Sequence, residues 1–393
     1  MNRDLRNYLT VTGGYWAFTL TDGAIRMLVV LYFHQLGYSP FAIAMLFLFY
    51  EFFGIVTNLV GGWLADRLGM NVTMHLGMAM QVGALAMLAV PVAMLTVPYV
   101  MFAQAVSGIA KDLNKMSAKS SVKTLVPQGE SARLFKWVVL LTGSKNALKG
   151  VGFFLGAMLL TLVGFSHALL ILAASLLMVM LATMLILPRE LGKSTAKTKF
   201  TQVFSNNAAI NWLSAARFFL FGARDVWFVV AVPVFMYSEL HWDFIWVGSF
   251  MALWVIGYGI VQAAVPMLLR ARPADAKAAQ LWSGVLLIIP VGMALALMQC
   301  WDSASVLVLG LIVFGIVFAI NSALHSYLIL AYADNDKVAL KVGFYYMANA
   351  GGRLVGTVLS GWGYQQYGLI GCLWLSAGFI SLAWGLSLRL PRV

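Results

Sequence analysis

Long apolar stretches separated by short polar segments run along the whole chain. Each stretch holds about 20 or more residues, the length that an α-helix needs to cross the hydrocarbon core of a bilayer. The weaker ten-residue alternation typical of outer-membrane β-strands does not occur in them. The stretches lie at 8–34, 40–65, 72–92, 96–116, 135–162, 166–187, 208–236, 244–269, 278–298, 303–331, 339–363 and 367–388. The pattern therefore predicts an all-α integral membrane protein with twelve transmembrane helices.

The composition agrees with this class, because 62% of the residues are hydrophobic and 10% are charged, against about 25% charged residues in soluble proteins. Eighteen of the 26 lysines and arginines lie in the terminal segments and in the loops on the N-terminal side, and the six opposite loops contain none. Short cytoplasmic loops retain Lys and Arg. We therefore expect a bacterial inner (cytoplasmic) membrane protein with both termini in the cytoplasm.

This topology also accounts for the formal net charge of +12. Loop cations attract the anionic headgroups of membrane lipid, so the charge does not indicate a nucleic-acid partner. Cys300 and Cys372 are too few, and their surroundings too apolar, for a disulfide framework or a metal site. We expect no metal and no cofactor, and we expect a monomer.

The polar segment 188–207 divides the predicted helices into six and six. Moving the second half back by about 204 residues places Arg353 and Gly356 on Lys149 and Gly152, so the fifth and eleventh spans share a cation one turn before a glycine. The sequence thus predicts an N-terminal six-helix half at 1–187, a cytoplasmic linker at 188–207 and a C-terminal six-helix half at 208–393, related by an internal repeat.

The turn after the second span reads Gly62-Trp-Leu-Ala-Asp66-Arg67-Leu-Gly69. It resembles the signature that major facilitator transporters carry between their second and third spans, although Met70 and Asn71 replace its basic residues. The resemblance implies the major facilitator fold, a midplane site between the halves and alternating access. It also implies a gating role for Gly62, Asp66, Arg67 and Gly69, for which an ordinary polar turn is the alternative.

Eight cations lie inside the apolar stretches, where a charge costs about 2.5–3.5 kcal/mol and normally faces a substrate or ion path. Four carboxylates share this depth, so the interior is net positive and suited to an anion. As substrate-binding residues we expect Arg26, Lys111, Lys115, Lys145, Lys149, Arg224 and Arg353. As additional polar lining we expect Gln104, Asn114, Asn146 and Arg217. For Lys115 and Arg217, snorkelling toward the membrane surface stays open as an alternative.

The four carboxylates are Asp22, Glu51, Asp112 and Asp225. Glu51 has no local partner, and an unpaired carboxyl group in the membrane would hold a proton tightly. It is the first candidate for proton coupling, followed by Asp22, Asp112 and His325. Salt bridges to cations on other spans are the alternative. Asp22 can pair with Arg26 one turn away, whereas Arg224 and its neighbour Asp225 are not expected to pair, because adjacent residues diverge on a helix.

Several charged strings give a closer resemblance that extends over nearly the whole chain. They are YWAFTLTDG at 15–23, LYFHQLG at 31–37, SGIAKDLNKMSAKS at 107–120, TGSKNALKG at 142–150 and ARFFLFGARDVW at 216–227. These strings are similar to those of the ArsJ-type organoarsenical efflux permeases. The resemblance implies export of 1-arseno-3-phosphoglycerate, arsenate resistance, and a functional link to a glyceraldehyde-3-phosphate dehydrogenase that makes this ester. Its two anionic ends suit a cationic interior.

Other functions remain open at this point. An organophosphate or sugar-phosphate exchanger, or another proton-coupled organic-anion transporter, would use the same buried cations. A membrane enzyme is disfavoured because the sequence contains neither a His-Glu-x-x-His zinc motif nor a Gly-x-Ser-x-Gly nucleophile elbow. A receptor that binds without transport is the third class.

Overall fold

The computed structural model describes residues 3–68, 70–125, 131–187, 207–268, 275–332 and 338–391, and within these ranges the chain forms helices and no strand. The elements are α1 (Arg3–Gln35), α2 (Pro40–Leu46), α3 (Leu48–Leu68), α4 (Met70–Leu88), the short 3-10 helix η1 (Val92–Met94), α5 (Val97–Leu125), α6 (Ser131–Val163), α7 (Phe165–Ile186), α8 (Ala208–Phe228), α9 (Ala231–Ser238), α10 (Phe244–Leu268), α11 (Ala276–Met298), α12 (Ser303–Ala331) and α13 (Val338–Ser387). The predicted all-α class is confirmed.

Four of the predicted spans appear in a different form from a single straight helix. The second span is divided into α2 and α3 at Phe47, and the seventh into α8 and α9 at 229–230. The last two spans are joined in α13, which turns back at Gly368, where φ is +62°. A positive φ of this kind is open to glycine at little cost. Counted in this way, the described helices make the twelve passes that the sequence predicts.

Nine segments of the described residues are long and apolar enough to cross a membrane by length and composition, and the last, Phe344–Ser387, contains both passes of α13. Neither α4 nor α5 belongs to this set. Both helices are more polar, since α4 carries His75 and Gln81 and α5 carries Lys111, Asp112 and Lys115. Thus α5, one of the two helices with the weakest apolar signal, carries much of the buried charge.

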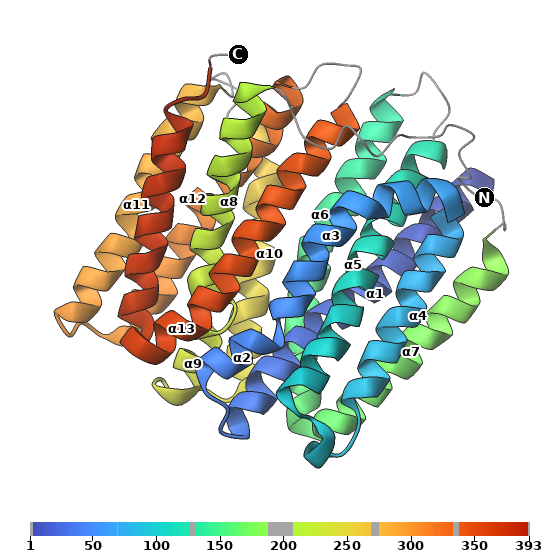
Figure 1. The fold of residues 1–393 in the computed structure, drawn as a ribbon, viewed down its shortest axis with the longest axis horizontal. Coiled ribbons are helices and arrows are strands. Elements are labelled where there is room, and N and C mark those ends of the chain that lie inside the picture. The colour runs from blue at the N-terminus through green and yellow to red at the C-terminus, as the bar shows by residue number, and fades with distance from the viewer. Residues whose placement is uncertain are drawn as a thin grey trace.

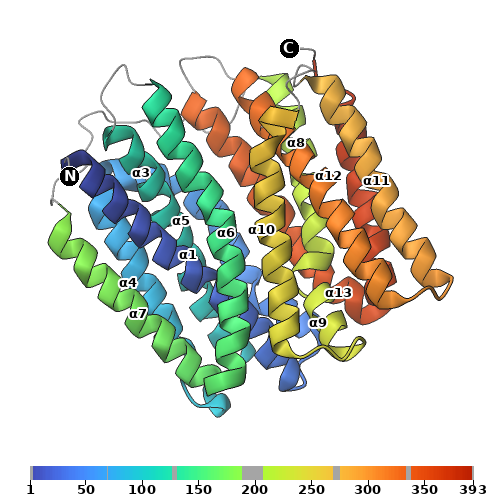
Figure 2. The same ribbon diagram turned by 180° about the vertical axis from the view of Figure 1, so that it is seen from behind.

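The helices form two groups that lie side by side (Figure 1), with α1–α7 in one group and α8–α13 in the other. Both chain ends lie at the same edge of the bundle, which we call the terminal edge, and the view from behind shows the same arrangement (Figure 2). The segment between α1 and α2, the segment between α9 and α10, and the kink of α13 lie at the opposite edge, which we call the far edge.

Some sequence predictions fall on residues that are not described. The linker lies outside the described residues over 188–206, and Asn207 caps the N-terminus of α8 by accepting from the amides of Ala209 and Ile210. Of the predicted gating motif, Gly62, Asp66 and Arg67 lie on α3, but their side chains are not among those described. Gly69 lies outside the described residues. The gating role therefore stays a prediction.

Close glycine contacts fix the helices that carry the site. Gly152 on α6 packs against α1, and a Cβ there would lie 3.0 Å from the Cα of Gly23. Gly356 on α13 packs against α8, and its Cβ would lie 2.9 Å from the Cβ of Asp225. Small residues allow such approach between helices in a membrane, where packing replaces the hydrophobic effect. Lys149 and Arg353, one turn earlier, are thus held in corresponding places.

The two groups of helices also meet directly at the far edge. The His34 ring nitrogen Nε2 lies 2.7 Å from Ser238 Oγ, and these residues are 204 apart in sequence, the offset of the internal repeat. The amide of Phe41 donates to Gln365 Oε1 at 3.2 Å, and Gly361 packs against the backbone of Pro40. We call these contacts of α1 and α2 with α9 and α13 the far-edge seal.

Replacing Gly156 with valine tests the glycine packing. Its added atoms would collide with the backbone of Ala24 on α1, and overpacking of this kind costs about 1–3 kcal/mol. We expect a lower melting temperature of the purified protein in detergent. Gly13→Val is the matched control, because a Cβ at Gly13 meets nothing within 4 Å. Equal melting temperatures for the two variants would contradict the packing argument.

Candidate functional site

Two connected cavities lie between the helix groups. The larger, which we call the central cavity, has a volume of about 1270 Å³ out to the open solvent, and the smaller side cavity has about 620 Å³. Tyr15, Lys115, Lys145, Lys149, Tyr346, Asn349 and Arg353 line both. The central cavity is also lined by Arg26, Asn146, Arg217 and Arg224, and the side cavity by Lys111. All eight cations singled out in the sequence therefore lie on these walls.

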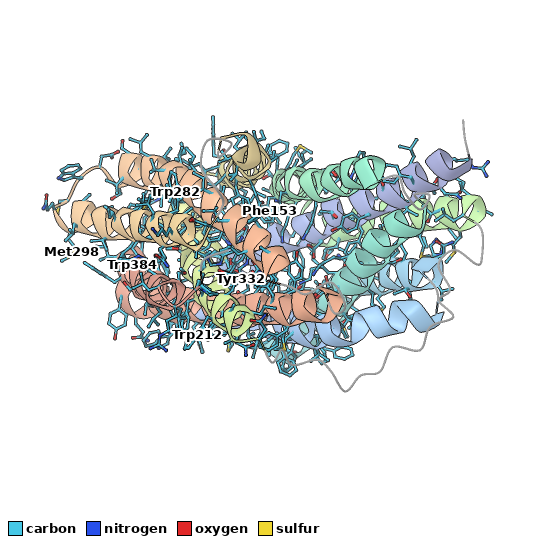
Figure 3. The ribbon with its side chains drawn as sticks, turned by 90° about the horizontal axis from the view of Figure 1, so that it is seen from above. Phe153, Trp212, Trp282, Met298, Tyr332 and Trp384 are labelled. Atoms are coloured by element: carbon cyan, nitrogen blue, oxygen red, sulfur yellow. The ribbon has the colours of Figure 1, made fainter. Side chains whose placement is uncertain are left out.

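The cavities end well before the far edge. The lining residues nearest that edge are Arg26 on α1, Phe153 on α6, Phe228 on α8 and Trp254 on α10. The rings of Phe153 and Phe228 are 6.1 Å apart, and those of Phe228 and Trp254 are 5.1 Å apart, so aromatic side chains close this end. Seen from above, Phe153 lies where the two groups of helices meet (Figure 3).

Five charged residues form a continuous series at the closed end, which we call the ion-pair chain. Arg26 Nη2 and Arg353 Nη2 both lie close to Glu51 Oε1, at 2.7 and 2.6 Å. Arg353 Nε lies 3.1 Å from Asp225 Oδ2, and Arg224 Nη2 lies 2.5 Å from Asp225 Oδ1. Three guanidinium groups thus alternate with two carboxylates, and both carboxylate side chains are 1% exposed.

This geometry decides one open alternative and corrects one expectation. Glu51 has no local partner, and of the two interpretations left open for it the structure shows the salt bridge to other spans, because it accepts from Arg26 and Arg353. Arg224 and Asp225 were not expected to pair, yet Arg224 Nε donates to Asp225 Oδ1 at 2.6 Å. The long arginine side chain curls back over its own backbone, which helix spacing alone does not show. The hypothesis of proton coupling at Glu51 assumed an unpaired carboxyl group, and Glu51 is paired in the structure.

The lysines of the N-terminal group share the other two carboxylates. Lys149 Nζ lies 3.9 Å from Asp22 Oδ2, and the hydroxyl of Tyr50 donates to the other Asp22 oxygen at 2.5 Å. Asp22 therefore pairs with Lys149 rather than with Arg26. Lys115 Nζ lies 3.3 Å from Asp112 Oδ1, and Lys111 Nζ lies 4.0 Å from its Oδ2. Each carboxylate that was a proton-coupling candidate is therefore in an ion pair.

Aromatic rings and neutral groups hold the arginines of α8. The Arg217 guanidinium lies 3.9 Å from the ring centroid of Phe221, donates from Nε to Asn349 at 3.1 Å, and donates from Nη1 to the Ser322 carbonyl at 3.2 Å. Arg224 lies 5.0 Å from the Phe221 centroid and 5.5 Å from that of Phe228. Faces of aromatic rings attract cations without neutralising them, so the Arg217 charge remains available to an anion, whereas Arg224 is also paired with Asp225.

The walls of the central cavity are accordingly electropositive. Seven of the eight cations line it, and neither Asp nor Glu occurs among its described lining residues. Glu51, Asp22 and Asp112 border the side cavity instead, while Asp225 borders neither. Cations held in a space with low-dielectric walls focus the field on a negative solute. The arrangement can bind an anion through guanidinium and ammonium groups from both groups of helices.

Three predicted residues are not part of these walls. Gln104 and Asn114 are buried on α5 but line neither cavity, and the Asn114 amide instead approaches the Met74 carbonyl at 3.4 Å. His325 is also buried away from both cavities, and neither of its ring nitrogens has a hydrogen-bond partner among the described residues. At 100° per residue Gln104 lies on the same face of its helix as Lys111, seven residues later, which is why the sequence predicts it as lining. Neighbouring helices cover that part of the face.

The structure adds neutral lining residues that the sequence did not indicate. Tyr258 donates to Ser322 Oγ at 3.1 Å, and Gln262 donates to the same oxygen at 3.2 Å. Asn146, which was predicted, lies 3.4 Å from Gln262 Oε1 and joins this polar wall to α6. Aromatic and small polar residues are common in membrane helices. Their presence in the sequence therefore does not indicate a site until the fold shows that they face the same cavity.

Comparison with known proteins identifies the family. The Major Facilitator Superfamily model matches residues 11–340, and the chain belongs to this superfamily. A comparison with curated protein sequences gives no match. Because the superfamily consists of transporters, the protein is a multi-pass membrane transporter of small substrates and not an enzyme. The resemblance of the turn at Gly62–Gly69 to the signature of this superfamily led to the same assignment.

Solved structures share the fold over almost the whole chain. The nucleoside transporter NupG (D323A mutant) has a TM-score of 0.74 at 17% identity, with 99% of each chain covered. A POT family transporter in complex with 5-aminolevulinic acid has a TM-score of 0.78 at 13% identity, covering 98% of this chain and 95% of its own. A D-xylose–proton symporter has a TM-score of 0.74 at 14% identity, with 98% and 97% covered. At these identities the likeness shows the fold alone.

Replacing Lys149 with glutamine tests whether the central cavity binds anions. Lys149 lines both cavities, and a charge-assisted hydrogen bond contributes about 1.5–3 kcal/mol, so we expect pyrophosphate to bind about tenfold more weakly or worse. The measurement is the pyrophosphate concentration that raises the melting temperature of the purified protein. Lys277→Gln is the control, because Lys277 is exposed on α11. Equal affinities in the two variants would contradict the assignment.

Proposed function

We propose that the protein is an efflux transporter for a small phosphorylated metabolite with two anionic groups. The observation that carries the proposal is the central cavity, with seven cations and no carboxylate among its described lining residues. A solute with two oxyanion ends must give up much of its hydration on entering, and charge-assisted hydrogen bonds are among the few interactions strong enough to offset this loss. Arginine provides a planar fork for such groups, while lysine provides a mobile point charge.

The placement of the donors supports two anionic ends rather than one. Arg26, Arg224 and Arg353 lie together at the closed end of the central cavity. Lys115 and Lys145 line the walls nearer the terminal edge, on α5 and α6. An elongated dianion would meet the guanidinium groups with one end and the ammonium groups with the other. A single small anion would need fewer of these groups.

The candidate substrate is 1-arseno-3-phosphoglycerate, which would make the protein an arsenate-resistance transporter. The support is the resemblance of its charged strings to ArsJ-type permeases. The residues of those strings that carry charge inside the membrane line the cavities, except Asp225, which is paired with the lining residue Arg224: Asp22, Lys111, Asp112, Lys115, Lys145, Lys149, Arg217 and Arg224. This proposal includes a functional link to a glyceraldehyde-3-phosphate dehydrogenase, which would form the ester in the cytoplasm.

We further propose a monomer in the bacterial cytoplasmic membrane with both termini in the cytoplasm, and with halves at 1–187 and 208–393 joined by the linker 188–207. The cavities are then closed toward the outside by the far-edge seal and would load from the cytoplasm. Outward movement of one negative charge across an inside-negative potential releases about 2.3 kcal/mol per 100 mV. A multiply charged ester would therefore leave down its electrical gradient without an obligatory proton.

Everted membrane vesicles test this function. The vesicles would receive arsenate, glyceraldehyde 3-phosphate, NAD and the dehydrogenase, and arsenic trapped inside would be measured. We expect accumulation that requires all four additions, because arsenate alone lacks the second anionic end. Vesicles with Lys149→Gln should accumulate about tenfold less, and vesicles with the exposed-site control Lys277→Gln should match the parent protein.

Two outcomes would redirect the assignment. Uptake of labelled 3-phosphoglycerate against internal phosphate, with no arsenic accumulated, would identify an organophosphate or sugar-phosphate exchanger. Accumulation that disappears when a proton gradient is collapsed while the electrical potential is kept would identify a proton-coupled organic-anion transporter. His325 would then be the next residue to replace, because the other candidates are in ion pairs.

A further inference from the structure

The ion-pair chain lies between the cavities and the far-edge seal. Glu51 is in the first turn of α3, immediately after α2, which packs against α13 in the seal. Arg353 is on α13, about two helical turns before Gly361, whose contacts with Pro40 and Ala44 form part of the seal. A change in the Arg353–Glu51 pair would therefore act on the helices that keep the far edge closed.

The two carboxylates of the chain differ in what they connect. Asp225 holds Arg224 and Arg353, and all three residues belong to the C-terminal group of helices, on α8 and α13. Glu51 holds Arg26 on α1 and Arg353 on α13, so it connects the two groups. Among the described ion pairs, Arg353–Glu51 is the one that crosses from α1–α7 to α8–α13.

One oxygen of Glu51 accepts from both arginines. Glu51 Oε1 accepts from Arg26 Nη2 at 2.7 Å and from Arg353 Nη2 at 2.6 Å, so this carboxylate oxygen separates two guanidinium groups from opposite sides of the molecule. Without the negative charge, the two arginines would repel each other across the interface in a poorly hydrated place. Loss of Asp225 would create a similar repulsion, but within one group of helices.

We propose that Glu51 is a latch that keeps the far-edge seal closed while the site is empty. An anionic substrate opens the latch by taking Arg26 and Arg353 away from Glu51, a step that rests on the proposed function. Both arginines line the central cavity, whereas Glu51 lines only the side cavity, so an oxyanion in the central cavity can reach both guanidinium groups. Once Arg353 turns to the substrate, α3 and α13 lose the ion pair between them.

The latch can be tested without any substrate, by measuring the opening of the far edge. Gln35 and Glu239 are exposed next to His34 and Ser238, and cysteines at these two positions can carry spin labels. The two native cysteines, Cys300 and Cys372, would first be replaced by serine. Pulsed electron paramagnetic resonance spectroscopy in phosphate-free buffer then gives the distribution of distances between the two spin labels.

In this labelled protein, Glu51→Gln removes the charge with little change of shape. We expect the ratio of long to short label distances to rise about tenfold or more, because a buried pair that loses one partner is strongly destabilised. Asp225→Asn is the matched control, since it removes a carboxylate from the same Arg353 without crossing the interface. Its ratio should stay within about twofold of the parent. Glu51→Asp keeps the charge on a shorter side chain, so we expect its ratio to lie between those of the parent and Glu51→Gln.

Unchanged distances in a folded Glu51→Gln protein would overturn the latch, and so would an equal shift in Asp225→Asn. If Glu51→Gln does not fold, Arg353→Lys provides the same test, because one ammonium group cannot hold Glu51 and Asp225 as the guanidinium does. An unchanged distribution in a folded Arg353→Lys protein would likewise overturn it. If neither variant folds, Glu51→Asp decides, since a shortened latch must open the seal partly and an unchanged distribution rejects it.

A second measurement separates the latch from the proposed function. Adding 3-phosphoglycerate, as a stable probe with two anionic groups, to the labelled parent protein should also lengthen the distances. Opening in Glu51→Gln with no response to the probe would support the latch and count against a phosphorylated substrate. A response to the probe with no opening in Glu51→Gln would support the substrate class and reject the latch.

Discussion

The constraint on which the structure depends is the cost of keeping ionised groups inside a membrane. Eight cations and four carboxylates lie within segments that must fold against hydrocarbon, and an isolated charge there is expensive. None of the four carboxylates lines the central cavity, each is within an ion pair, and Glu51 and Asp225 are almost completely buried. The cations are left as the wall of the central cavity. The central cavity is therefore a space in which a negatively charged solute can pair with these cations.

Helix packing places these charges where they can cooperate. Gly152 brings α6 against α1, and Gly356 brings α13 against α8, so the same kind of contact occurs in each half. These contacts fix the positions of Lys149 and Arg353, because each lies one turn before its glycine. The far-edge seal then closes one side of the site through His34 and Ser238, which occupy corresponding positions in the repeat. Binding and closure thus both involve α1 and α13.

The two halves stabilise their cations by different means, and this affects what the site can do. The lysines of the N-terminal group share Asp22 and Asp112, whereas Arg217 and Arg224 lie on aromatic faces of the C-terminal group. A ring face leaves a guanidinium almost fully charged, while a carboxylate must be displaced before its partner can bind strongly. Arg217 on α8 is therefore ready for an anion, whereas Arg26, Arg224 and Arg353 must change partners when the anion arrives.

The sequence by itself determined the fold class, the twelve passes, the one-sided loop charge and the eight interior cations, because the length and polarity of a membrane helix are local properties. It also identified the correspondence of Lys149 with Arg353. The tertiary structure decided which charges meet. In the sequence, Glu51 has no local partner and a salt bridge to another span stays open, and the structure shows that it accepts from Arg26 and Arg353. Gln104, on the face of Lys111, is covered by neighbouring helices. Helical spacing gives the direction of a side chain, but the partner it reaches depends on how separate helices pack.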